Sequence, residues 1–162
     1  MVVKDNKAIY EKLRVHLMAD GMYRIPTRRE VLQILELGFD PEEVTVALSM
    51  PITGQGRITL DDLGERTGLS PAKLQEMLEA MIQKGLVLAQ VNRRGEDVYC
   101  LWDFMYSLYA PLYGDGFDDD HKRQIAAIRQ KLWQAGFNYL WFSSSYPFNR
   151  VIPHEKAIAP GE

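Results

Sequence analysis

The chain has 162 residues, of which 46% are hydrophobic and 25% are charged; this composition is typical of a folded globular protein and excludes a disordered one. Its net charge of −3 argues against a protein that coats nucleic acid or anionic lipid through bulk positive charge. The single cysteine, Cys100, excludes a disulfide framework, and no run approaches the roughly 18 apolar residues of a membrane span. We therefore expect a cytoplasmic protein without membrane association.

Amphipathic helices are predicted over residues 1–57, which we assign to an N-terminal helical region. The first covers residues 5–18 and has apolar side chains at helical spacing. The second begins at a capping box, T-R-R-E at residues 27–30. The third covers residues 40–50 and begins with an aspartate N-cap followed by Pro41 at the first helical position.

Residues 58–101 form the segment on which the rest of the prediction depends, because they begin with two helices joined by a short turn. Thr59 can cap the first helix, and Gly68 can adopt the left-handed conformation that ends it. Ser70 and Pro71 then provide the N-cap and first position of the second helix. That helix carries an apolar stripe at i, i+4, i+7 and i+8, formed by Leu74, Leu78, Met81 and Ile82.

A β-hairpin is predicted directly after the second helix. Residues 86–91 and 98–101 have strand character, and residues 92–95 (N-R-R-G) are typical of the turn between them. Two helices followed by a hairpin are the order of a winged helix-turn-helix. The predicted fold class is therefore mainly α, a winged helix-turn-helix with a three-helix core and a β-hairpin wing, with additional flanking helices.

Aromatic-rich helices are predicted over residues 102–142, followed by a linker or tail at residues 143–162. Read as a helix, the first stretch gathers large side chains on one face, namely Trp102, Met105, Tyr106, Tyr109 and Tyr113. Such a face either packs across the winged-helix core or forms a subunit interface, where aromatic residues and methionine are enriched. The second interpretation predicts a homodimer. A further helix is predicted over residues 121–135.

No motif in the sequence supports catalysis or metal binding. The acidic run at residues 115–120 does not fit an EF-hand loop, because Asp120 and Ala126 stand where that loop needs glycine and glutamate. The histidines lie in separate predicted elements, and Cys100 in a predicted strand resembles a small buried hydrophobic residue. We therefore predict no enzymatic activity, no metal site and no cofactor in this chain.

The charges of the winged segment leave its role open between DNA binding and protein docking. In favour of DNA, Arg93 and Arg94 at the predicted wing tip suit phosphate contacts. The start of the second helix adds three candidate groove contacts, Ser70, Lys73 and Gln75. Against DNA, Glu76 and Glu79 share the outward face of the same helix, and acids outnumber bases by seven to five over residues 59–101.

The tail sequence P-F-N-R-V-I-P at residues 147–153, followed by E-K-A-I at 155–158, resembles a junction in anaerobe proteins with a ferredoxin-type 4Fe–4S domain. In that family a helical, winged-helix-like region precedes the cluster domain. Two further stretches resemble it: F-D-P-E-E at residues 39–43 is similar to its F-T-P-E-E step, and L-E-A-M-I-Q-K-G-L at residues 78–86 is similar to its L-E-x-M-x-K-K-G-L stretch.

The resemblance implies an accessory module attached to, or descended from, an electron-transfer protein. The family's cluster ligands lie beyond the junction in C-x-x-C-x-x-C runs, whereas this chain has only Cys100. A 4Fe–4S cluster would accordingly belong to a further C-terminal domain outside this sequence. The leading hypothesis is a non-catalytic docking or regulatory module of a ferredoxin-like iron–sulfur protein, with a protein partner or self-association. The alternative is a winged-helix DNA-binding transcriptional regulator.

Overall fold

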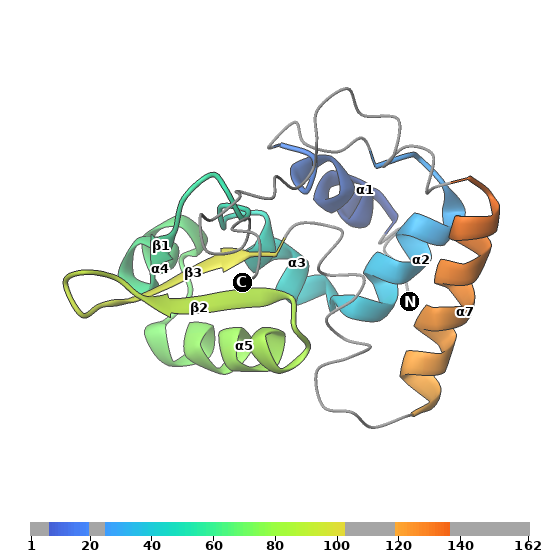
Figure 1. Cartoon of the computed structure of the whole chain (residues 1–162). Helices are drawn as coiled ribbons and strands as arrows, with labels where there is room; N and C mark the ends of the chain where they lie inside the picture. Colours follow the sequence, from blue (N-terminus) through green and yellow to red (C-terminus); the bar gives the residue numbers. More distant parts are fainter. Residues whose placement is uncertain (1–6, 20–24, 103–118, 137–162) are drawn as a thin grey trace, which may run out of the picture.

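A computed structural model describes residues 7–19, 25–102 and 119–136. The described chain is mainly helical and carries one small antiparallel sheet, as Figure 1 shows. In chain order its elements are α1 (Lys7–His16), α2 (Arg29–Gly38), α3 (Pro41–Ala47), β1 (Ile58–Thr59), α4 (Leu60–Thr67), α5 (Pro71–Gln83), β2 (Val87–Val91), β3 (Asp97–Leu101) and α7 (Asp120–Gln134). This order confirms the predicted fold class, a winged helix-turn-helix with flanking helices.

The wing belongs to a three-stranded sheet in which β3 lies between β1 and β2. Strands β2 and β3 pair antiparallel from Val87 opposite Leu101 to Val91 opposite Asp97. Strand β1 adds Ile58 opposite Tyr99 on the other edge of β3. Strand β1 is not predicted from the sequence, because its two residues are too few to show an alternating pattern and form a strand only by pairing with β3.

Local capping signals start α3, α4 and α5 where the sequence predicts them, although α3 ends at Ala47 and residues 48–50, predicted as helix, form a turn. The Thr59 hydroxyl accepts a hydrogen bond from the Asp62 backbone N–H (3.2 Å), and Gly68 ends α4 in the left-handed region at φ +70°. The Ser70 hydroxyl accepts from the Lys73 N–H (3.4 Å), with proline at the first position of α5. These caps orient α5 relative to α4.

The predicted capping box at residues 27–30 is wrong. The N-cap of α2 is Arg28, whose side chain makes no capping hydrogen bond, and the helix begins one residue later at Arg29. Thr27 therefore lies outside the capping position, and Glu30 lies too early in the helix to complete the box. The start of α2 depends instead on packing, since its buried side chains Val31, Leu32, Ile34 and Leu35 all face the core.

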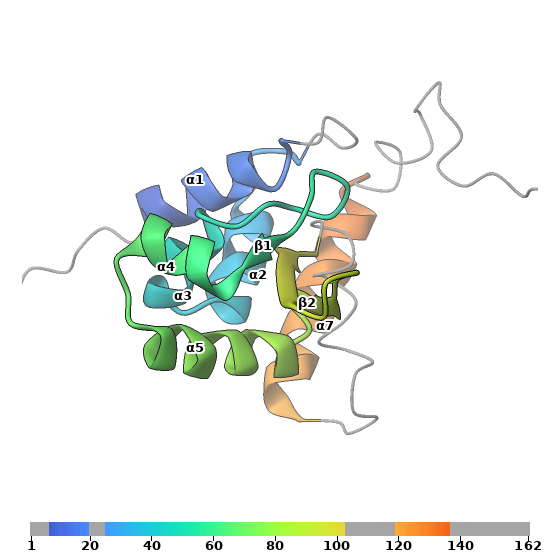
Figure 2. The same cartoon turned by 90° about the vertical axis from the view of Figure 1, so that its left-hand side faces the viewer.

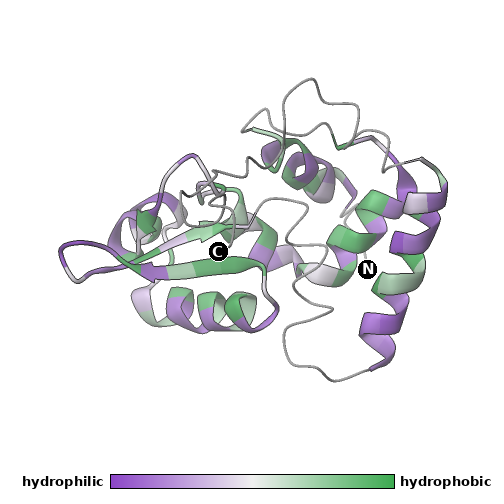
Figure 3. Cartoon of the chain, in the orientation of Figure 1, coloured by the Kyte–Doolittle hydropathy of each residue, from purple (hydrophilic) through white to green (hydrophobic). Residues whose placement is uncertain are grey.

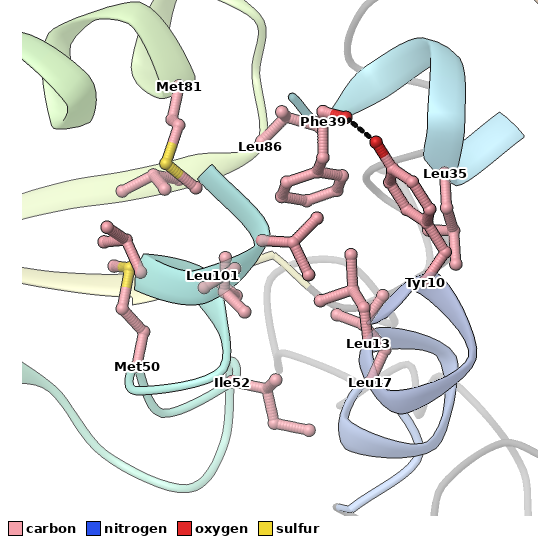
Figure 4. Close-up of a cluster of buried hydrophobic side chains, with 14 of the residues drawn as sticks. Tyr10, Leu13, Leu17, Leu35, Phe39, Met50, Ile52, Met81, Leu86 and Leu101 are labelled. Carbon is pink, nitrogen blue, oxygen red and sulfur yellow. Dashed lines mark hydrogen bonds between the residues drawn. The ribbon is translucent and has the colours of Figure 1, made fainter. Parts of the chain in front are cut away.

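One hydrophobic cluster joins the N-terminal helices to the winged segment, as Figure 4 shows. It includes Leu13 from α1 and Leu17 just after that helix, Phe39 between α2 and α3, Leu86 just before β2, and Leu101 from β3. The Tyr10 hydroxyl donates a hydrogen bond to the Phe39 carbonyl (2.8 Å), so α1 is tied by both apolar packing and a buried polar contact. The platform beneath α5 and the wing is therefore continuous with the preceding helices.

Helix α7 packs against α2 on the side of the molecule away from the wing, as Figures 1 and 2 show. It buries Ile125 and Leu132, which confirms the helix predicted over residues 121–135 to within one residue at each end. None of the helices described is long and apolar enough to cross a membrane.

The aromatic stripe falls mainly outside the described residues. Trp102 is described and half-buried, and its backbone N–H donates to the Leu86 carbonyl (3.0 Å). The other members of the predicted interface, Met105, Tyr106, Tyr109 and Tyr113, lie in the undescribed range, as does the R-V-I-P junction at residues 150–153. The subunit interface stays a prediction.

Candidate nucleic-acid interface

Helix α5 occupies the position of the second helix of a helix-turn-helix. It is joined to α4 by the short turn at residues 68–70, and both views place it alongside β2. Leu74, Leu78 and Met81 are buried beneath it, as the predicted apolar stripe requires, whereas Ile82 remains 37% exposed. The opposite face of α5 is consequently free to meet a ligand.

The outward face of α5 is occupied by contacts between its own side chains. Lys73 Nζ lies 3.7 Å from Glu76 Oε2, and the Gln75 amide donates to Glu79 Oε1 (3.1 Å). The Ser70 hydroxyl is engaged as the helix cap. The three groove residues predicted from the sequence therefore do lie on an exposed surface, but each already has a partner one turn away in its own helix.

Among residues 7–19, 25–102 and 119–136, a cationic partner is found for Glu76 of α5 but not for Glu79. The Lys73–Glu76 pair is solvent-exposed, and such pairs contribute little because water screens them. Glu79 accepts from the neutral Gln75 amide, so its negative charge is retained. The face of α5 that a DNA groove would meet thus keeps net negative charge.

The wing tip presents Arg93 and Arg94 to solvent on a turn held by backbone hydrogen bonds and by the Asn92 side chain. The side-chain oxygen Oδ1 of Asn92 accepts from the backbone N–H groups of Arg94 (2.8 Å) and Glu96 (3.0 Å), while the side-chain Nδ2 donates to Glu96 Oε2 (2.8 Å). Gly95 completes the turn at φ +81°. The hairpin projects beyond α4 and α5 and is hydrophilic at its tip, as Figures 1 and 3 show.

Replacing Asn92 with alanine is expected to lower the free energy of unfolding by about 1 kcal/mol, because three exposed hydrogen bonds at the turn are lost. Urea unfolding followed by circular dichroism measures the change. Asn92→Asp is the matched control: it keeps the acceptor oxygen for both backbone groups and should lose less. Equal losses for the two variants would contradict the role assigned to that oxygen.

A recess of about 310 Å³ lies between the two elements that would meet DNA. Its lining comes from the start of α4, from α5 and from the wing, namely Thr59, Leu60, Asp61, Gln75, Glu96, Asp97 and Tyr99. Three of these residues are acids. Burial raises the pKa of the Tyr99 phenol, and the carboxylates of Asp97 and Glu79 raise it further. The centre of the candidate interface is therefore negative, and its positive charge is at the wing tip.

Arg57 is a third arginine near the wing, and the sequence does not predict it as a site residue. Its guanidinium Nε donates to Gln90 Oε1 (3.1 Å) on β2, and Nη1 donates to the Gly56 carbonyl (2.8 Å). Because β3 lies between β1 and β2, this contact reaches across the sheet. Its only sequence signal is a basic residue next to a strand, and that signal is not readable because β1 is only two residues long.

Metal-binding groups are not gathered anywhere in the described ranges, where no three His, Cys, Asp or Glu side chains could hold an ion together. Cys100 is buried in β3, and that burial raises the pKa of its thiol. His16 lies elsewhere, with Nε2 2.9 Å from the Met50 carbonyl oxygen. A cysteine-based cluster cannot be assembled from this chain, which contains a single cysteine.

Comparison with known families matches residues 52–87 to winged helix-turn-helix DNA-binding domains. The matched range runs from the loop before β1 through α4 and α5 to the first residue of β2. No match was found among curated proteins or among solved structures, and nothing in these comparisons supports a relationship to ferredoxin-type 4Fe–4S proteins. The chain thus contains, at residues 52–87, a winged helix-turn-helix segment similar to DNA-binding domains of that class.

Proposed function

We propose that this protein is a non-catalytic, cytoplasmic DNA-binding regulator of the winged-helix kind. The observation that carries the proposal is the match of residues 52–87 to a DNA-binding family, because this range coincides with α4, α5 and the turn between them. The exposed Arg93 and Arg94 at the wing tip add a surface of the right charge for phosphate contacts.

The proposal predicts binding that depends on salt and on the wing. A fluorescence-anisotropy titration onto mixed genomic duplex fragments at low salt, repeated as the salt is raised, measures it. Wild-type protein should bind, and the affinity should fall as salt increases, because phosphate contacts release counterions. The variant R93E/R94E should lose this binding, since two attractive charges become repulsive.

The matched control is K12E/K131E, which makes the same change of net charge on two exposed lysines. Lys12 lies on α1 and Lys131 on α7, both remote from the wing. This variant should bind DNA within about twofold of wild type, since its charges lie on α1 and α7, away from the wing, and salt screens charges that are far from the interface. Failure of the wild-type protein to bind any duplex at low salt would contradict the proposed function.

Protein docking is the second candidate function, and the acidic recess between α5 and the wing favours it. The same surface that repels phosphate would attract a basic partner. In a longer protein that joins this module to a cluster domain, as the resemblance at residues 147–153 implies, deleting the module should weaken partner binding and leave cluster assembly intact. Unchanged partner affinity would contradict this function.

Self-association is a further part of the proposal and rests on the aromatic stripe that begins at Trp102. A homodimer would supply two wings, which is the arrangement that DNA half-sites about one helical turn apart require. Light scattering at high micromolar concentration should therefore give twice the monomer mass of 18.6 kDa. A measured mass equal to that of the monomer at this concentration would contradict self-association.

A further inference from the structure

The charges of the candidate interface are separated along it, with acids at its centre and arginines at one end. Glu76 and Glu79 project from the exposed face of α5, and Asp61, Glu96 and Asp97 line the recess beside that helix. Lys73, the cation on this face of α5, is paired with Glu76. An α5 that entered a major groove would bring these carboxylates toward phosphates with little screening, because the separations fall below a Debye length of about 10 Å.

The wing tip has the opposite properties. In the described part of the chain, neither the Arg93 nor the Arg94 side chain has a hydrogen bond or an ion pair, so their donors are available to a ligand. Glu96, the nearest acid in sequence, is engaged by the Asn92 amide (2.8 Å). The same asparagine side chain fixes the backbone at Arg94. The turn is therefore already ordered, and binding a ligand through the two arginines does not require the turn to lose further conformational entropy.

From this separation we infer that the wing, and not α5, is the main DNA contact of this protein. This inference rests on the proposed function and assigns different roles to the wing and to α5. Arg93 and Arg94 bind backbone phosphates, while the carboxylates of Glu76 and Glu79 hold α5 outside the major groove. Since phosphate contacts carry no base information, binding is tolerant of sequence. The Gln75 side chain, bonded to Glu79, does not read a base.

Three variants test the inference in anisotropy titrations on two duplexes of equal length and different sequence, at several salt concentrations. Neutralising the wing with R93Q/R94Q should lower affinity at least tenfold at low salt and reduce the salt slope by about 1.8, at about 0.9 per phosphate contact. The variant E76Q/E79Q should bind both duplexes several-fold more tightly, because it removes repulsion. Lys73→Ala should cost less than the wing variant does.

Different results would overturn the inference while leaving the proposed function standing. Weaker binding by E76Q/E79Q would mean that these carboxylates accept hydrogen bonds from cytosine amino groups, with α5 in the major groove. A loss for Lys73→Ala as large as that for R93Q/R94Q would place α5 against phosphate. Absence of wild-type binding to either duplex is the separate result that contradicts DNA binding itself. The exposure of all five side chains lets each variant fold, which circular dichroism checks.

Discussion

Replacing Phe39 with alanine is expected to lower the free energy of unfolding by about 3 to 5 kcal/mol, the largest single effect anticipated here. The side chain is 2% exposed and lies in the cluster shared by α1, α2 and the residues before β2 (Figure 4). Its removal leaves a cavity at the junction of these elements, which relax only in part. Because the free energy of unfolding of domains of this size is roughly 5 to 15 kcal/mol, this substitution would remove much of the protein's stability.

Urea unfolding measures this loss, and Phe39→Leu provides the control because it keeps most of the buried volume. The leucine variant should lose less than half as much as the alanine variant. DNA affinity of Phe39→Ala should remain near wild type at low temperature and be lost on warming as the protein unfolds, since Phe39 is a buried core residue and not part of α5's exposed face. A change below about 1 kcal/mol for Phe39→Ala would contradict the assigned packing.

Replacing Lys84 with methionine is expected to cost about 2 kcal/mol at neutral pH. Lys84 caps the end of α5, and its ammonium lies 2.8 Å from Glu43 Oε2 and 3.1 Å from Asp40 Oδ2 at the start of α3. Glu43 is only 5% exposed, so the substitution leaves a buried carboxylate without its cation. The cost is smaller than that of breaking a fully buried ion pair, because the Lys84 side chain is 37% exposed and water partly screens its charge.

The pH dependence of this contribution follows from the pKa of Lys84. Desolvation alone would lower that pKa, but hydrogen bonds to Glu43 and then Asp40 outweigh it and raise the pKa above its ordinary value. The folded protein therefore holds the proton more tightly than the unfolded chain does. The stabilisation is complete below the pKa of the unfolded lysine and is lost as the pH rises through the pKa of the folded one.

Urea unfolding of wild type and Lys84→Met at neutral and alkaline pH checks this sign. Burial also raises the pKa of Tyr10, but that group is present in both proteins and largely cancels in their difference. The difference in stability should shrink as the pH rises through the alkaline range. Lys12→Met, at an exposed position on α1, should change stability by less than about 0.5 kcal/mol. A difference independent of pH would show that the charge of Lys84 is not its source.

Signals that act over a few residues were readable in the sequence. Ser70 and Pro71 start α5, and Gly68 ends α4, because a hydroxyl cap, a fixed φ and a left-handed residue act on the adjacent backbone. The N-R-R-G turn was readable for the same reason, and the hairpin around it was found. The pattern T-R-R-E at residues 27–30 shows the limit, because the same local rule was overridden where packing moved the start of α2.

Features that depend on distant partners were not readable. Strand β1 exists because β3 pairs with it, and Ile52 forms its bridge with Leu101 for the same reason. Arg57 became a candidate contact only when the sheet placed it across from Gln90. The contacts of Lys84 with residues more than 40 positions earlier likewise need the tertiary fold.

The candidate site depends both on local sequence signals and on contacts that form only in the tertiary structure. By itself the sequence determined that a winged helix-turn-helix forms, that Arg93 and Arg94 stand at its tip, and that Glu76 and Glu79 share a face of α5, because periodicity and capping are local. Only the tertiary structure decided that Asp61 of α4 meets Glu96 and Asp97 of the wing in one recess beside that helix. Electrostatic potential depends on distances in space, and folding brings together charges that the chain keeps more than 30 residues apart.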